Sequence, residues 1–263
     1  MGLFDLLLLA VVQGVTEFLP VSSSGHLVLL GVLLGGDSVS GANLADSSLA
    51  LHVGTLVAIV VFYGPELWRM GTTDRRQLGL LLVGSLPAAA VGIPLKLTGW
   101  DESLHDPRLA ASLLIVSGLV LLLGRHCRDE QPEGRLTARM ALWIGLVQAV
   151  AILPGLSRSG LTITAGLVAG LSSREAARFS FLLAIPAIGG AGLLQVVELA
   201  GDSGGSVGVP LWQLGVATLV AAVVGWLSLT ALVAVLGRGR LAWFAVWCVP
   251  CGLGMLAYTL ATM

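Results

Sequence analysis

Charged side chains are scarce in this sequence of 263 residues, because Asp, Glu, Lys and Arg together make up only 11% of it. Soluble domains carry about 25%, so most of the surface of this protein does not face water. The net charge is −1, which leaves no basic field to attract nucleic acid. The chain is instead 56% hydrophobic, with 35 glycines that suit close helix packing in lipid.

The N-terminus lacks two common targeting signals. No basic stretch precedes its apolar run, so we do not expect a cleaved signal peptide, and the Ser or Thr of a myristoylation signal is missing. Cysteine is also sparse, with three residues in all. Cys248 and Cys251 form CVPC inside an apolar run, where packing thiols are favoured over a redox or metal pair.

Six apolar windows are long enough, or nearly so, to cross a bilayer, which takes roughly 20 residues per helix. They cover residues 48–63, 78–97, 109–124, 176–200, 211–236 and 241–261. The first and third windows need flanking residues to complete a span. We therefore predict an all-α polytopic membrane protein, with residues 1–263 forming a single integral membrane domain.

Two further apolar stretches, 3–34 and 138–171, are interrupted in the middle by Pro, Gly and Ser, in LPVSSSGH and LPGLSRSG. Such an interruption leaves backbone groups unpaired. This is tolerated at membrane depth only where protein or a watery cavity covers those groups. Each stretch is therefore predicted to form a re-entrant helix–loop–helix hairpin.

The distribution of basic residues predicts the orientation. With six spans and two hairpins, eleven arginines fall on one side of the membrane, and only Lys96 and Arg108 fall on the other. The eleven are Arg69, Arg75, Arg76, Arg125, Arg128, Arg135, Arg139, Arg174, Arg178, Arg238 and Arg240. The arginine-rich side is expected to face the cytoplasm, which leaves both termini outside.

The two interrupted stretches align with each other without gaps: when Gln13 is placed on Gln148, SSSG at 22–25 falls on SRSG at 157–160. We predict two repeats, about 1–124 and 138–261, each a re-entrant hairpin plus three transmembrane helices. Because three is odd, the second repeat must be inverted. The hairpin tips are then expected to meet near the midplane, where inverted repeats build their sites. Chance similarity of two Ser/Gly loops is the alternative.

The hairpin loops carry donors suited to an anion. Arg158 lies inside an apolar hairpin and offers a planar guanidinium to phosphate oxygens. The free N–H groups at each helix start attract anions, and glycines allow close approach. The other candidate substrate-binding residues are Ser22, Ser24, Gly25, Ser157, Ser159, Gly160 and Thr162. Together they predict a pocket for a phosphate or diphosphate, while a purely structural ion pair of Arg158 with Glu17 is the alternative.

Glu17 and His26 need a different role, because a carboxylate repels phosphate. Glu17 could ligate a divalent cation that bridges diphosphate oxygens, with Gln13, one helical turn earlier, adding a carbonyl oxygen. It could instead hold His26 in one tautomer. His26 could act as a general acid or base, form a phosphoenzyme, or be a hydrogen-bonded packing histidine. His52 could face the same cavity or simply pack.

In these residues the sequence resembles the undecaprenyl pyrophosphate phosphatase family, also called the bacitracin-resistance family. The first family motif is Glu or Gln, three residues, then Glu; here it reads Gln13-Gly-Val-Thr-Glu17 and continues FLPVSSSGH. The second motif, Pro-Gly-x-Ser-Arg-Ser-x-x-Thr, is present without departure from Pro154 to Thr162. The segment EAARFSFLLAIPA that follows, and the order of the spans, are also similar.

The resemblance implies hydrolysis of undecaprenyl diphosphate, a polyprenyl diphosphate lipid, to undecaprenyl phosphate and inorganic phosphate, which recycles the carrier lipid for cell-wall synthesis. It implies a multi-pass protein of the bacterial plasma membrane, with the active site open to the periplasmic or outer face, and Mg²⁺ or Ca²⁺ as cofactor. The functional positions it implies are Glu17, Ser23, His26, Ser157, Arg158 and Thr162. Because Gln13, and not Glu, occupies the first motif position, a metal site with two carboxylates would lack one of its anionic ligands.

On this basis we expect Ser23 to attack the terminal phosphorus, with His26, oriented by Glu17, handling the proton. Arg158, the hydroxyls of 157–162 and the cation would balance the charge on the transferred group. Attack by His26, or by a metal-bound water, stays open as an alternative.

Two other function classes fit the sequence less well. Membrane phosphatidic-acid phosphatases share SGH and SR, but they need a Lys-rich first motif and a His four residues before an Asp, and no histidine follows Arg158 here. A flippase or transporter of polyprenyl phosphate would use the same inverted-repeat phosphate pocket, yet Glu17, Ser23 and His26 exceed what binding alone needs. The glycine-rich faces could pack within one chain or between two, so a homodimer is also open.

Overall fold

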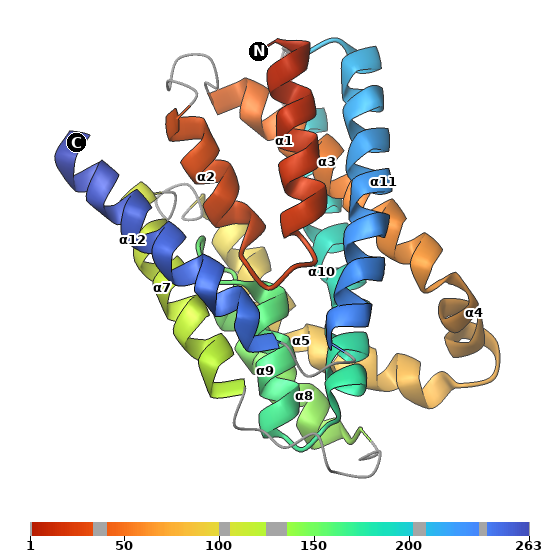
Figure 1. Cartoon of the computed structure of the whole chain (residues 1–263). Helices are drawn as coiled ribbons and strands as arrows, with labels where there is room; N and C mark the ends of the chain where they lie inside the picture. The colour runs from red at the N-terminus through yellow and green to blue at the C-terminus, as the bar shows by residue number, and fades with distance from the viewer. Residues whose placement is uncertain are drawn as a thin grey trace.

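The computed structural model describes residues 2–33, 41–99, 106–124, 136–201, 209–236 and 241–262. Within these ranges every regular element is a helix, as the sequence predicts (Figure 1). The elements are α1 (Leu3–Thr16), α2 (Ser23–Leu33), α3 (Gly41–Phe62), α4 (Gly64–Thr72), α5 (Arg75–Leu97), α7 (Pro107–Gly124), α8 (Ala138–Val150), α9 (Arg158–Val168), α10 (Ser173–Gly201), α11 (Leu211–Leu236), η1 (Leu241–Phe244) and α12 (Ala245–Thr262).

Among the described residues, five helical stretches are long and apolar enough to cross a membrane: α5, α7, α10, α11, and η1 together with α12. A sixth candidate is α3 with the short α4, which are bent by 70° relative to each other. Pro65 stands in the first turn of α4, where its missing N–H is harmless but where it prevents α3 from continuing. The six candidates coincide with the six predicted windows, so this is a multi-pass membrane protein.

The two interrupted stretches each form a pair of short helices, α1 with α2 and α8 with α9, of 11 to 14 residues. Such helices are too short to cross a bilayer alone. The turn between α1 and α2 lies in the interior of the molecule, where α9 begins (Figure 1). In the second turn Gly155 has φ +92°, and a Cβ there would come within 2.1 Å of Ala110 O. Only glycine fits at this position.

Many of the helix crossings are close because one helix presents glycine. A Cβ on Gly54 of α3 would lie 2.4 Å from Thr218 O of α11, and one on Gly145 of α8 would lie 2.2 Å from Gly84 O of α5. Large apolar side chains, including Leu82, Leu119 and Leu219, are instead exposed on the outside of the helices. Small residues at the helix crossings and large apolar residues on the outer surface are what a helix bundle surrounded by lipid requires.

Candidate active site

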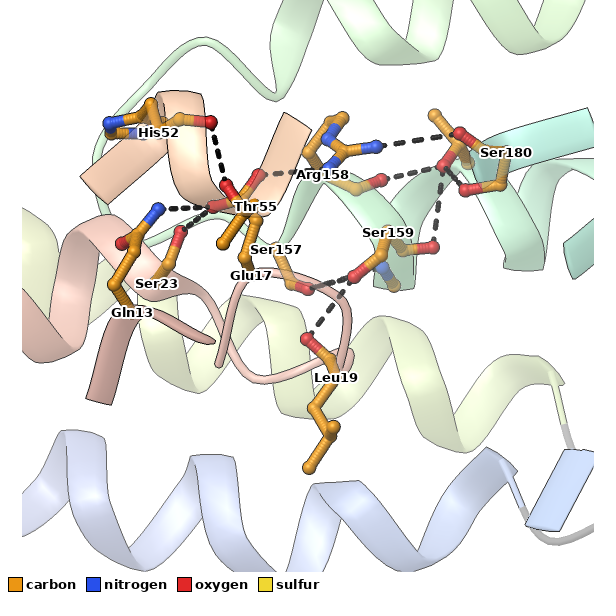
Figure 2. Close-up of polar contacts among 12 residues, drawn as sticks. Gln13, Glu17, Leu19, Ser23, His52, Thr55, Ser157, Arg158, Ser159 and Ser180 are labelled. Carbon is orange, nitrogen blue, oxygen red and sulfur yellow. Dashed lines mark hydrogen bonds and ion pairs between the residues drawn. The ribbon is translucent and has the colours of Figure 1, made fainter. Parts of the chain in front are cut away.

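The two turns meet each other, although they are far apart in the chain (Figure 2). Arg158 NH2 lies 3.0 Å from Glu17 Oε1, and Ser159 Oγ donates to Leu19 O at 3.2 Å. Ser24 Oγ also accepts from Gly155 N at 3.4 Å. The predicted contact between the tips of the two interrupted stretches is confirmed.

The two turns begin their second helices in the same way. Ser22 Oγ accepts from Gly25 N at 3.3 Å, and Ser157 Oγ accepts from Gly160 N at 3.1 Å, so each serine is the N-cap of its helix. Ser22 caps α2 from a left-handed conformation, with φ +67°, which is uncommon for a residue other than glycine. A Cβ on Gly25 would lie 3.3 Å from Gly155 Cα, which shows how closely the turns approach.

Glu17 is the residue on which the polar contacts converge (Figure 2). The residue is 8% exposed, and its carboxylate accepts from Arg158 NH2, from Ser23 Oγ at 2.6 Å and from Gln13 Nε2 at 3.0 Å. A buried carboxylate needs such partners to offset its desolvation. The short bond from the Ser23 hydroxyl is the geometry of a nucleophile beside its base.

His26 does not belong to this group, so the expectation that Glu17 orients His26 is wrong. Its Nδ1 lies 2.8 Å from Ser22 O, the carbonyl one turn earlier, and its Nε2 accepts from Trp247 Nε1 at 2.8 Å. Nδ1 of His26 is therefore bonded within its own turn, and Nε2 contacts Trp247 of α12 instead of Glu17. The hydroxyl of Ser23, which we expected His26 to deprotonate, is bonded to Glu17.

Arg158 and Thr162 are tied to α10 through Ser180, a residue that the sequence analysis did not single out. Arg158 NH1 donates to Ser180 O at 3.4 Å, and Thr162 Oγ1 lies 2.5 Å from Ser180 Oγ and donates to Arg158 O at 2.7 Å. Ser180 lies in the segment EAARFSF, between Phe179 and Phe181. A hydroxyl between two aromatic residues was the sequence signal for a buried polar contact.

His52 of α3 lies beside the cluster (Figure 2). Its Nδ1 is 2.7 Å from Ser48 O, and Thr55 Oγ1 donates to the His52 carbonyl at 3.0 Å. Both contacts lie within α3, so the two interpretations of His52, facing the cavity or simply packing, stay open.

A divalent cation would find few ligands here. No group of three His, Cys, Asp or Glu residues gathers among the residues the structure describes. Glu17 offers one carboxylate, and the buried Gln13 Oε1 has no hydrogen-bond partner. Amide and carboxylate oxygens suit Mg²⁺ and Ca²⁺, and Mg²⁺ commonly takes one or two carboxylates together with substrate phosphates. The residues thus fit a cation whose coordination the substrate completes.

Comparison with known proteins places the chain in a family. The model of the bacitracin resistance protein BacA family matches residues 6–254. A protein named undecaprenyl-diphosphatase from Rhodopirellula baltica is 44% identical over 255 residues, covering 95% of this chain and 96% of that protein. Proteins of the same name from Corynebacterium glutamicum and Alteromonas mediterranea are 36% identical over 269 residues and 42% identical over 214 residues. They cover 96% and 76% of this chain, and 89% and 78% of their own lengths. The family match and these long alignments show that the chain belongs to the bacitracin resistance protein BacA family.

Proposed function

We propose that this protein hydrolyses undecaprenyl diphosphate to undecaprenyl phosphate and inorganic phosphate in the bacterial plasma membrane, and so recycles the carrier lipid for cell-wall synthesis. The observation that carries the proposal is the cluster of Glu17, Ser23 and Arg158, which places a hydroxyl, a base and a cation in contact between two helix starts. The names of relatives that align with most of the chain support the choice of substrate.

The contacts favour a sequence of steps that uses these three residues. The diphosphate binds between the turns, where the N-termini of α2 and α9 and the Arg158 guanidinium attract its charge. Glu17 takes the proton of Ser23 as Oγ attacks the terminal phosphorus, the bond to the bridging oxygen breaks, and Glu17 passes that proton to the departing undecaprenyl phosphate. The regenerated Glu17 carboxylate then deprotonates the water that attacks the phosphoserine, and the proton returns to Ser23 Oγ as phosphate leaves.

We expect Glu17 and Gln13 to hold Mg²⁺ or Ca²⁺ when the substrate supplies the remaining ligands. The ion would neutralise charge on the phosphate oxygens. The ion pair with Arg158 already offsets the charge of the Glu17 carboxylate, so binding of a cation alone should be weak. Titration with Mg²⁺ in the presence and absence of a prenyl methylenediphosphonate tests this, since tight binding of the ion without the lipid would contradict it.

We further propose that the chain consists of two inverted repeats, with α1–α2 and α8–α9 as re-entrant hairpins whose tips meet near the midplane. The alignment that places Gln13 on Gln148 supports this proposal, because it also matches α2 to α9 along their whole length. The first residues, Ser23 and Arg158, coincide, and so do the last, Leu33 and Val168. It pairs the two N-caps, Ser22 and Ser157, as well. In addition, α10, α11 and α12 follow α9 as α3, α5 and α7 follow α2. The arginine-rich side is proposed to be cytoplasmic, and the site is proposed to open to the periplasm, as the family resemblance implies.

The proposal needs no second copy of the chain. The glycines at the crossings of Gly54 and Gly145 are used inside one chain, whereas a Cβ on Gly215 or Gly254 would have no neighbour within 4 Å. A homodimer stays a prediction, which light scattering of the detergent-solubilised protein tests.

Release of phosphate from a prenyl diphosphate by the purified protein in detergent tests the function. Hydrolysis needs no closed membrane, whereas transport does, so turnover in micelles separates the phosphatase from a flippase. We expect turnover by the wild-type protein and its loss in Arg158→Ala, with folding checked by circular dichroism. Absence of turnover by the wild-type protein over a range of Mg²⁺ and Ca²⁺ concentrations would contradict the proposal.

A further inference from the structure

The ring of His26 is bonded at both nitrogens, and the two partners together fix its protonation state. Ser22 O can only accept, so Nδ1, at 2.8 Å, carries the proton. The indole N–H of Trp247 can only donate, so Nε2, also at 2.8 Å, carries the lone pair. His26 is thus a neutral imidazole with its proton on Nδ1. The nitrogen that would accept a proton or attack phosphorus is already engaged by Trp247.

Trp247 belongs to α12, which the sequence places 221 residues from His26. The indole lies nearly parallel to the imidazole, with 11° between the planes, and is 58% exposed, whereas His26 is 9% exposed. The indole therefore lies between the buried imidazole of His26 and the outside of the helix bundle.

The same part of α12 makes further contacts with the first turn. Cys248 Sγ lies 3.6 Å from Pro20 O, and Cys251 Sγ lies 4.0 Å from His26 Nε2. Among the described residues, the titratable group in contact with His26 Nε2 is the Cys251 thiol. The Glu17 carboxylate is bonded to Gln13, Ser23 and Arg158 instead. The CVPC segment thus packs on the turn, as expected of packing thiols, and brings Trp247 with it.

We propose that Trp247 is a positioning residue that keeps His26 in the neutral Nδ1–H tautomer and covers its Nε2 until a lipid diphosphate headgroup, arriving beside α12, displaces the indole. The identity of the headgroup rests on the proposed function. An imidazolium would point an N–H at the indole N–H, so protonation of His26 requires the indole to move. Phosphate oxygens accept hydrogen bonds from both groups, so headgroup binding, indole displacement and protonation of His26 favour one another.

Trp247→Phe tests the proposal, because it keeps an aromatic ring and removes the N–H. Trp212→Phe is the matched control, since Trp212 is 60% exposed and lies in the first turn of α11. The readout is ¹⁵N NMR of protein labelled at histidine, with the His26 signals identified by their loss in His26→Gln. In the wild-type protein and the control we expect the Nδ1–H tautomer. In Trp247→Phe we expect a mixture of tautomers, and protonation of His26 at a pH higher by about one unit, the equivalent of one hydrogen bond.

The wild-type spectrum alone can overturn the proposal, whatever the folding of the variant, if it shows the proton on Nε2. An unchanged tautomer and titration in folded Trp247→Phe would overturn it as well. The rate of phosphate release as a function of pH is a second readout. The part of this pH profile that depends on His26 is identified by its loss in His26→Gln, and it should move to higher pH in Trp247→Phe. A merely structural role would lower the rate without moving that part of the profile. Failure of the wild-type protein to release phosphate would count against the proposed function, while the NMR result would still decide the role of Trp247.

Discussion

At the scale of single residues, Ser23 has the most specific geometry. Its hydroxyl donates to Glu17 Oε2 at 2.6 Å, while the pairing of Glu17 with Arg158 uses the other carboxylate oxygen. Removal of the hydroxyl should therefore abolish the nucleophile without breaking the ion pair.

Ser23→Ala is expected to lower kcat roughly 10³-fold or more, measured as phosphate release from a prenyl diphosphate in detergent. The thermal unfolding midpoint should change little. Ser112→Ala is the control, because Ser112 is an exposed serine of α7 whose hydroxyl donates to Arg108 O within its own helix. Equal turnover of the two variants would show that another group, such as His26 or a water, attacks the phosphorus.

Arg158→Lys separates charge from geometry. The guanidinium contacts Glu17 through NH2 and Ser180 O through NH1, two directions that one ammonium cannot reproduce. We expect kcat to fall about 10²-fold, as when a single positioned donor is lost, with the fold retained. Turnover equal to that of the wild-type protein would mean that Arg158 acts only as a charge.

At the scale of elements, the second turn depends on Gly155. Its φ of +92° and the 2.1 Å approach of an added Cβ to Ala110 O are two separate obstacles to a side chain. Gly170, which follows α9, has φ +93° but has no atom within 4 Å of its Cβ position. The two glycines thus differ in steric contact but share a backbone conformation.

Gly170→Ala should therefore cost only the left-handed backbone strain, about 1–2 kcal/mol of unfolding free energy. Gly155→Ala should be clearly more destabilising and should also abolish phosphate release, because the turn must move away from α7 and from Ser24. Thermal unfolding in detergent and the hydrolysis assay measure both effects. Similar midpoints for the two variants would contradict the close contact of the turn with α7.

The elements themselves were largely predictable, because their signals are local. Runs of apolar residues defined the spans, and Pro and Gly within LPVSSSGH and LPGLSRSG defined the two turns. The bend between α3 and α4 at Pro65 was not anticipated. The partners of His26 could not be predicted either, because they depend on where α12 packs. Hydropathy shows that α12 is a span, but it does not show that Trp247 faces α2. The contact of Ser180 with Arg158 was missed for the same reason.

At the scale of the whole molecule, the orientation of the protein in the membrane can be tested directly by cysteine labelling. Thr73 follows α4 on the arginine-rich side, and Thr98 follows α5 on the other side; both are exposed. In a background in which the three cysteines are replaced, Thr98→Cys should react with a membrane-impermeant maleimide at the periplasmic face. Thr73→Cys should react only after the membrane is permeabilised. The reverse pattern would place the arginine-rich side outside and contradict the proposed orientation.

The central claim is that two turns far apart in the sequence form one catalytic site. A double-mutant cycle of Glu17→Gln, Arg158→Gln and the double variant tests it through phosphate release from a prenyl diphosphate. Since the two side chains are paired at 3.0 Å, residues acting as a unit should show strong non-additivity. We predict that the double variant is about as slow as the slower single variant. Losses that simply multiply, or wild-type turnover in either single variant, would contradict the account.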